Sequence, residues 1–425
     1  MSFSFHLVLP IVGSLVISGC MFFGLREDVK ELGAATTISG AINTTSPRNK
    51  PILVALYKSE GNDKYGLATY SVMYGPGPFD FLRDRGDYYL FAFEDANEDF
   101  TFQPDEYVGW YGDPQITLIE ARPGINFTNL QIVLRPPEQA KAELPELYAP
   151  SAKHAPLKLP ESRQRGKVVA LDDPRFTPEV GPLGMWEPVK FYQQGYSGIF
   201  FFEPYHPDKT PVLLIHGLSG SGYDWRYIIK QLDRNRFQPW VVQYPSGNRL
   251  GLLSERINQA VTDLQARYKF DTLFVVAHSM GGLVARGFIN HNVSQYDQGF
   301  IKLLVTISTP WQGHTAAQSG VTNAPVVVPS WYDMVPGSPY LESLFDPPLP
   351  DHISYYLLFS HRGTRGLMSK ANSDGTVTLR SQLPLVAQNR AIKVFGYDED
   401  HISILHSEAV VNKLTEIMMA VQNQR

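Results

Sequence analysis

A regular alternation of short apolar runs and amphipathic stretches after residue 190 constrains the fold more than any other feature. PVLLIHG at 211–217 and TLFVVAHS at 272–279 are continuous apolar runs, typical of strands that are buried on both faces. Between them, residues 254–268 carry apolar side chains at helical spacing. Strands that alternate with such helices predict an α/β architecture, in which helices cover both faces of a mostly parallel sheet.

The overall composition excludes several classes of protein. With 425 residues, 43% of them hydrophobic, the chain is long enough for two domains. A formal net charge of −5 provides no basic field, so we expect no nucleic-acid partner. The single cysteine, Cys20, rules out a disulfide framework and a cysteine metal site.

The N-terminus is apolar and ends in the motif ISGC, which resembles the lipobox of bacterial lipoproteins. The resemblance implies a signal peptide over 1–19 and a lipidated Cys20 that anchors the chain in a membrane. Pro10 and Gly13 shorten the run below the length of a transmembrane helix, and an ordinary cleaved signal peptide needs no cysteine there. Met21 stands where an inner-membrane retention Asp would be, so the resemblance favours the outer membrane of a bacterial cell envelope.

Before the α/β part, the chain divides into three segments. Residues 20–36 are expected to form a tether, and 37–135 contain short alternating strands that predict a small β-sandwich preceding the α/β domain. This sandwich resembles carboxypeptidase-regulatory and transthyretin-like domains. The proline-rich segment 136–188 is expected to be a linker, or an arm that wraps the α/β domain at 189–425.

The stretch VVAHSMGGLVAR, residues 275–286, places a serine between a strand and a helix. In a G-x-S-x-G nucleophile elbow the serine lies on a tight, strained turn, so the residues two before and two after it must be small. Here they are Ala277 and Gly281, on either side of Ser279. A simple strand–helix turn is the alternative, and other parts of the chain are needed to decide.

An oxyanion hole needs two backbone N–H donors, one from the residue after the nucleophile and one from an earlier loop. Met280 would supply the first donor. The segment LLIHGLSGSG at 213–222 follows an upstream strand, and Leu218 is its expected donor. The alternative for this segment is a flexible glycine-rich loop.

A carboxylate and a histidine should follow the serine in that order. Asp374 follows the strand ISYYLLFS, and His401 follows the last core strand, so both lie at the edge of the sheet where ligands gather. The remaining candidates are rivals or supporting residues. Asp333 is the rival acid and His406 the rival base, whereas His216 and His278 are expected to hydrogen-bond around the catalytic loops.

Together HGLSG, AHSMGG, ISTPWQG, PGSPYLESL, SDGTV and DHISIL resemble the lipase and esterase branch of the α/β-hydrolase superfamily. The resemblance covers about residues 205–425. It implies cleavage of a carboxylic ester, such as a lipid or acyl ester, through an acyl-enzyme on Ser279, with no metal or organic cofactor. An acyltransferase or thioesterase would use the same triad, and a non-catalytic surface binding protein on the same fold is a further alternative.

An insertion at about 311–350 is apolar and proline-rich. In lipases this region often forms a cap over the acyl pocket, and a packed structural excursion is the alternative. The side chains that would suit an apolar acyl chain are Val326, Val327, Val328, Trp331 and Met334.

The sandwich contains one acidic loop, DANEDFTFQPDE at 95–106, with the oxygen spacing of a Ca²⁺ loop. The side chains at the ligand positions are Asp95, Asn97, Asp99, Thr101, Gln103 and Glu106. Phe100 replaces the glycine that normally permits the sharp turn, and a solvated acidic hairpin is the alternative.

Overall fold

The computed structural model describes most of the chain. The described residues are 24–31, 35–47, 50–61, 64–123, 125–140, 165–295, 299–363 and 372–423. The predicted signal peptide and Cys20 therefore lie outside the described residues. Within them, no helix combines the length and the apolar composition needed to cross a membrane.

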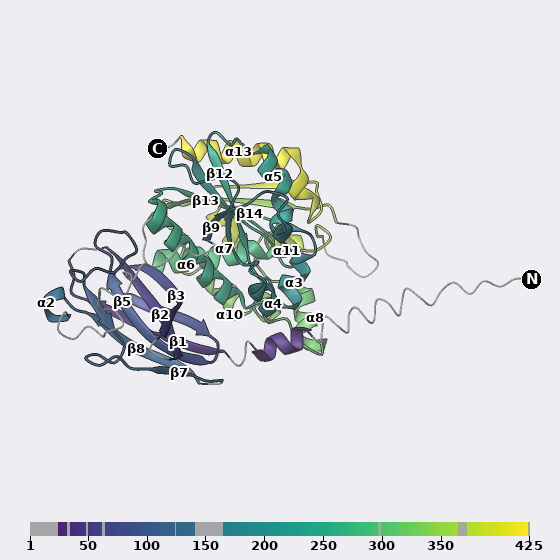
Figure 1. Cartoon of the computed structure of the whole chain (residues 1–425). Helices are drawn as coiled ribbons and strands as arrows, with labels where there is room; N and C mark the ends of the chain where they lie inside the picture. The colour runs from purple at the N-terminus through teal and green to yellow at the C-terminus, as the bar shows by residue number, and fades with distance from the viewer. Residues whose placement is uncertain are drawn as a thin grey trace, which may run out of the picture.

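Two sheets form the N-terminal part, which Figure 1 shows in purple and blue. Their strands are β1 (Thr36–Thr44), β2 (Pro51–Gly61), β3 (Lys64–Tyr74), β4 (Gly77–Arg83), β5 (Gly86–Glu94), β6 (Val108–Trp110), β7 (Ile119–Ala121) and β8 (Phe127–Leu134). One sheet has the order β4-β1-β8 and the other β3-β2-β5-β6, with β7 paired to β5. Ile38 and Ile132 of the first sheet pack with Val54 and Leu90 of the second, so the strands form a sandwich as predicted.

The second sheet of the sandwich is covered on its outer face as well. Phe91 and Phe93 of β5 lie in a cluster that includes Ala266 of helix α6 (Leu250–Tyr268). At the same boundary, the hydroxyl of Tyr70 donates to Asp263 of α6 over 2.9 Å. The strands β2 and β5 are therefore continuous apolar runs, because both faces are buried.

The rest of the chain forms an eight-stranded sheet in the order β16-β15-β14-β13-β11-β12-β10-β9. The strands are β9 (Arg165–Val168), β10 (Gly198–Phe201), β11 (Thr210–Ile215), β12 (Phe237–Gln243), β13 (Leu273–His278), β14 (Ile301–Ile307), β15 (Ser354–Ser360) and β16 (Lys393–Tyr397). Every neighbouring pair is parallel except β10 and β12. The predicted α/β architecture with a mostly parallel sheet is confirmed.

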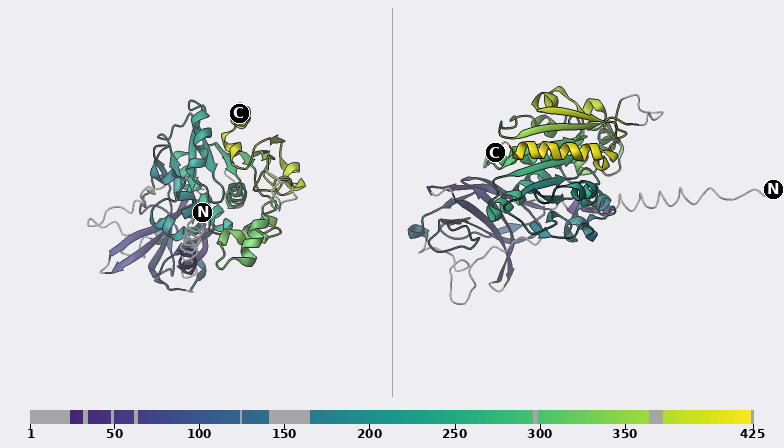
Figure 2. Two further views of the ribbon diagram at one scale, coloured as in Figure 1. Left: turned by 90° about the vertical axis from the view of Figure 1, so that its right-hand side faces the viewer. Right: turned by 90° about the horizontal axis from the view of Figure 1, so that it is seen from above.

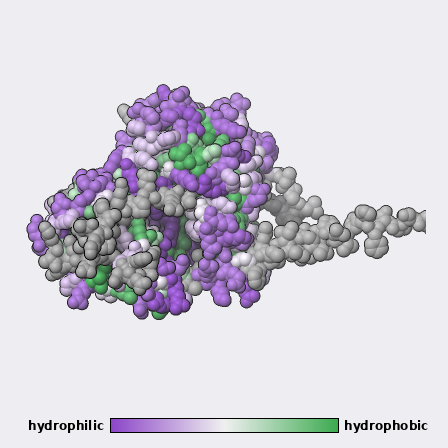
Figure 3. Space-filling view, in the orientation of Figure 1, coloured by the Kyte–Doolittle hydropathy of each residue, from purple (hydrophilic) through white to green (hydrophobic). Residues whose placement is uncertain are grey.

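Helices cover both faces of this sheet (Figure 2). The longer helices are α6, α7 (Met280–Gln295) and α13 (Glu408–Gln422). The shorter ones are α3 (Val180–Trp186), α4 (Pro188–Gln193), α5 (Arg226–Gln231), α8 (Thr315–Asn323), α9 (Pro329–Met334), α10 (Pro339–Ser343), α11 (Leu379–Gln382) and α12 (Leu385–Arg390), with single 3₁₀ turns at Pro174–Phe176, Gly222–Trp225 and Ser403–His406. Helix α2 (Pro137–Ala140) lies instead against the sandwich (Figure 1). Helices α6 and α7 pack on one face, and α5 and α13 on the other. The surface in Figure 3 is mainly hydrophilic, because most apolar side chains are used between these layers.

Residues 165–188 of the proline-rich segment belong to the α/β unit, whereas α2 near its start packs with the sandwich. Strand β9 pairs with β10 at the edge of the large sheet, and α3 and α4 follow it. Gly181 of α3 lies so close to the loop after β11 that an added Cβ would be 2.1 Å from the carbonyl oxygen of Ser219. This segment therefore supports the loop that contains Leu218, the expected oxyanion donor.

One acidic pair joins the sandwich to α6 and leads to a prediction. Burial of Glu255, together with a hydrogen bond to Asp80 of β4, raises the pKa of Glu255 well above its ordinary value. At a pH between the ordinary and the raised pKa, Glu255 is protonated in the folded state and loses its proton on unfolding. Because of this, Glu255 makes the free energy of unfolding fall as the pH rises toward the raised pKa. We expect Glu255→Gln to be more stable relative to the wild type at pH 8.5 than at pH 5.5, as measured by urea denaturation.

The matched control for this prediction is Glu342→Gln, which changes an exposed carboxylate on α10. The difference in free energy of unfolding between Glu342→Gln and the wild type should be the same at both pH values. An unchanged difference for Glu255→Gln as well would contradict the assignment of a protonated carboxyl at this boundary.

Candidate active site

Strand β13 ends at His278 and helix α7 begins at Met280, so Ser279 alone forms the turn between them. Its φ of 53° lies in the left-handed region, which is strained for a residue with a side chain. An added Cβ at Gly281 would lie 2.3 Å from the carbonyl oxygen of His216, so no larger residue fits there. The turn has the geometry of a nucleophile elbow.

The structure brings the three predicted triad residues together. His401 Nε2 lies 2.8 Å from Ser279 Oγ, and His401 Nδ1 lies 2.7 Å from Asp374 Oδ2. Because a carboxylate only accepts hydrogen bonds, Nδ1 carries the proton and the Nε2 lone pair faces the serine hydroxyl. Ser279 is 9% exposed, His401 6% and Asp374 not at all. Ser279 and His401 thus keep a small exposed fraction, whereas the Asp374 carboxylate has none.

Asp374 is surrounded by donors. Oδ1 accepts from the backbone N–H groups of Thr376 and Val377, while Oδ2 accepts from the side chains of Ser360 and Gln382 as well as from His401. Burial by itself raises the pKa of Asp374, but the hydrogen bond and charge of His401 and the other donors outweigh it, so the pKa is lowered. The carboxyl stays ionised beside the imidazole.

Two backbone N–H groups belong to residues close to the serine: Met280 follows it directly, and Leu218 follows Gly217 in the loop after β11. An added Cβ at Gly217 would lie 2.9 Å from Ser279 Cβ, so the loop after β11 passes directly beside the nucleophile. Among the described residues, neither the N–H of Leu218 nor that of Met280 donates a hydrogen bond. Met280 also begins the sixteen-residue helix α7, whose N-terminal end favours negative charge. Leu218 and Met280 therefore stay the predicted donors of an oxyanion hole.

The sequence of elements and the geometry of the turn decide the fold family. Ser279, Asp374 and His401 follow β13, β15 and β16 in the order serine, acid, histidine, at the carboxyl ends of a mostly parallel sheet. The described residues from 165 onward have the α/β-hydrolase fold. Residues 208–338 also match a family model described as "Putative serine esterase (DUF676)".

Several solved structures resemble this α/β-hydrolase part. A lipase from Bacillus licheniformis in its mature form is 18% identical, covering 52% of this chain and 97% of that one, with a TM-score of 0.40. A protein described as "a putative esterase from Staphylococcus aureus" is 13% identical, with 52% and 80% covered and a TM-score of 0.38. Phospholipase PlaB from Legionella pneumophila is 16% identical, with 41% and 45% covered and a TM-score of 0.34. No curated protein sequence matches the chain.

Both rivals to the predicted triad residues lie elsewhere. Asp333 accepts hydrogen bonds from the Arg249 guanidinium, at 2.7 Å for Nη2, and from the N–H of Leu250 at the start of α6. His406 is exposed, and its Nδ1 is 3.4 Å from the carbonyl oxygen of Ile402. Asp333 thus holds the cap against α6, and neither residue contacts His401.

His216 and His278 are also buried, and they support the loops of this site. His278 Nε2 lies 2.8 Å from the carbonyl oxygen of His401, and His216 stacks on Tyr244 with ring centroids 4.1 Å apart. Burial lowers the pKa of His278 to about 3 and that of His216 to about 4. Both rings are therefore neutral at physiological pH.

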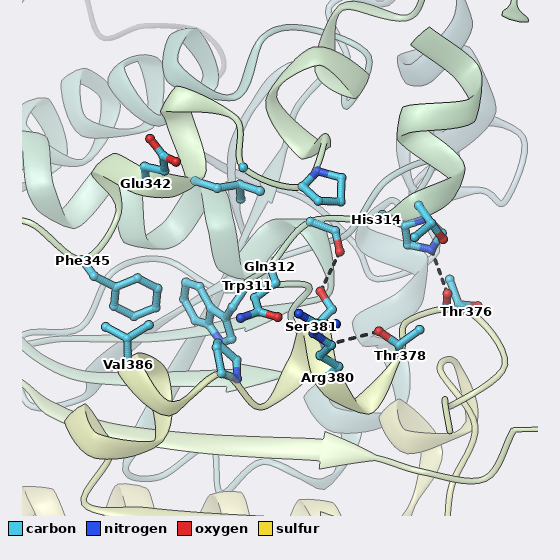
Figure 4. Close-up of a pocket in the computed structure, with 16 residues that line it drawn as sticks. Trp311, Gln312, His314, Glu342, Phe345, Thr376, Thr378, Arg380, Ser381 and Val386 are labelled. Atoms are coloured by element: carbon cyan, nitrogen blue, oxygen red, sulfur yellow. Dashed lines mark hydrogen bonds between the residues drawn. The ribbon is translucent and has the colours of Figure 1, made fainter. Parts of the chain in front are cut away.

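The predicted cap insertion forms helices α8 to α10. Its residues 336–345, with the loop 311–315 and residues 376–386, enclose a cavity of about 650 Å³ (Figure 4). In Figure 4, Trp311, Phe345 and Val386 make an apolar end, while His314 and Thr376 lie at the other end. Neither Ser279 nor His401 lines this cavity, but its lining residue Thr376 donates its N–H to Asp374.

The acidic loop of the sandwich uses its carboxylates internally. Asp95 accepts hydrogen bonds from the N–H groups of Asp99 and Phe100, and Glu106 accepts from those of Ala96 and Gln103. Phe100 has a φ of 60°, so it adopts the conformation that glycine usually supplies. Within the described ranges, no group of three or more His, Cys, Asp or Glu side chains could hold a metal ion. Calcium binding stays a prediction.

Proposed function

We propose that this chain is a membrane-anchored serine hydrolase that cleaves carboxylic esters of lipids or other acyl compounds. The observation that supports it best is the chain of hydrogen bonds from Ser279 Oγ through His401 to Asp374. The two unpaired N–H groups of Leu218 and Met280 beside the serine add a place for a developing negative charge.

In this proposal, acylation begins when His401 Nε2 takes the proton of Ser279 Oγ as the oxygen attacks the ester carbonyl. Asp374 stabilises the imidazolium that forms. The N–H groups of Leu218 and Met280 stabilise the negative oxygen of the tetrahedral intermediate. His401 then gives the proton to the leaving alcohol, and the acyl group remains on Ser279.

Deacylation repeats these steps with water as the nucleophile. His401 accepts a proton from water, the hydroxide attacks the acyl carbon, and the returned proton restores the Ser279 hydroxyl as the acid leaves. An alcohol or thiol in place of water would make the same site an acyltransferase, and a thioester substrate would make it a thioesterase. The proposed chemistry uses the chain's own residues and no cofactor.

The proposal includes a lipid anchor at Cys20 and a place in the bacterial cell envelope. The motif ISGC supports both. Since Gly24 begins a helix only four residues after Cys20, the two residues can be at most about 14 Å apart. A hydrolase held that close to a lipid surface would meet membrane lipids directly. Palmitate incorporation that is lost in Cys20→Ser would support the anchor.

Labelling by a fluorophosphonate probe tests the enzyme assignment, because the probe reacts only with an activated serine. We expect the wild type to be labelled and Ser279→Ala to remain unlabelled, with Ser330→Ala, a buried serine of the cap, labelled like the wild type. A folded wild type without labelling would contradict the proposal and favour a binding protein. Rates on p-nitrophenyl esters and acyl thioesters, with and without alcohol acceptors, then distinguish the three reactions.

A further inference from the structure

The helix at residues 24–31, between the predicted anchor and the sandwich, lies against the catalytic unit. In Figure 1 it is the purple helix near α4 and α8, apart from the sandwich strands that follow it in the chain. The carboxylate of Asp28 accepts a hydrogen bond of 2.8 Å from the N–H of Val189 at the start of α4. The expected tether is therefore a docked element of the α/β-hydrolase.

Leu25 is the apolar contact of this helix and is fully buried. It packs in a cluster with Met185 of α3 and with Val328, which directly precedes α9 of the cap and is also fully buried. The side chain of Leu218 packs against the same cluster. Leu25 thus fills the space between the cap and the loop that carries the proposed oxyanion donor.

The two sides of the proposed site therefore differ. On the side of Asp374, the cavity of about 650 Å³ is open. On the side of Leu218, the apolar cap residue Val328 faces other side chains, and Leu25 is among them. An acyl chain could enter this second side only if the space that Leu25 occupies were free, because side chains in a packed cluster leave no room for a chain.

We propose that Leu25 is a specificity-determining residue, which closes the Leu218 side of the site and limits the length of the acyl group accepted. This inference rests on the proposed ester hydrolysis. It also gives the tether a second role: the helix that follows the proposed anchor forms a wall of the site, so the site stands at the membrane-proximal end of the chain.

The test compares kcat/KM for p-nitrophenyl esters of four and twelve carbons. We expect Leu25→Ala to raise the long-to-short ratio by about fivefold or more, since one methylene in an apolar pocket changes selectivity by about tenfold. Leu25→Val should shift the ratio in the same direction by less. Leu25→Met, which conserves volume, should keep the wild-type ratio.

Leu56→Ala is the matched control, because it removes an equally buried leucine from the sandwich core. It should lower stability and leave the ratio unchanged. Wild-type ratios in both Leu25→Ala and Leu25→Val, with fluorophosphonate labelling intact, would overturn the inference while the hydrolase assignment stands. Absence of labelling and turnover in the wild type would instead overturn the proposed function itself.

Discussion

Replacing Ser279 by alanine is expected to lower kcat for ester hydrolysis by about 10⁶-fold, the size of effect seen when a triad nucleophile is removed. The Ser279 hydroxyl lies 2.8 Å from His401 Nε2 and is the proposed nucleophile, so its removal prevents the covalent intermediate. Initial rates on a short p-nitrophenyl ester, with the variant's folding checked by circular dichroism, measure the loss.

The double variant of Ser279→Ala and His401→Ala makes the same prediction more stringent. Because the two side chains act as one unit, the double variant should be no slower than either single variant, within about threefold. The residual rate would come from the oxyanion donors and from binding. Losses that multiply in the double variant would contradict a shared proton-transfer step.

Asp374→Asn is expected to lower kcat by about 10⁴-fold at neutral pH, as in triads where the acid becomes an amide. The carboxylate accepts from His401 Nδ1 at 2.7 Å, which fixes the tautomer whose Nε2 can take the serine proton. An amide could present its N–H₂ to Nδ1 and favour the opposite tautomer. The pH–rate profile of the variant, measured beside the wild type, separates this effect from loss of fold.

Asp333→Asn is the matched control, since Asp333 is also a buried carboxylate but lies on helix α9 of the cap. It should keep kcat within about threefold and lose about 1–3 kcal/mol of stability, because its hydrogen bonds to Arg249 and the N–H of Leu250 are weakened. A large loss of activity in Asp333→Asn with none in Asp374→Asn would show that Asp333, and not Asp374, is the acid of the triad.

Much of the site could be predicted because local sequence carries its geometry. A strained turn tolerates few residues, so a serine flanked by Ala277 and Gly281 between a strand and a helix is a specific signal. The carboxyl ends of parallel strands meet at one edge, so residues that follow β15 and β16 must approach that serine. The order of the elements thus indicated Asp374 and His401, although they lie 27 residues apart in sequence.

Other features of the site had no local signal. Gln382 lies on the short helix α11 and reaches Asp374 only because the chain folds back. Ser360 ends a predicted strand, but the sequence does not show that its hydroxyl faces the carboxylate. Proline content suggested a connector at 136–188, yet β9 adds to the sheet and α3 supports the loop of Leu218.

The sequence by itself determined the α/β pattern, the sandwich strands before it and the residues of the nucleophile turn, because periodicity and steric limits act over a few neighbouring residues. Only the tertiary structure decided that Leu25 packs beside Leu218, that Asp333 holds the cap and that the sandwich covers α6. These contacts join residues far apart in the chain, and their energy comes from complementary surfaces that no local pattern records.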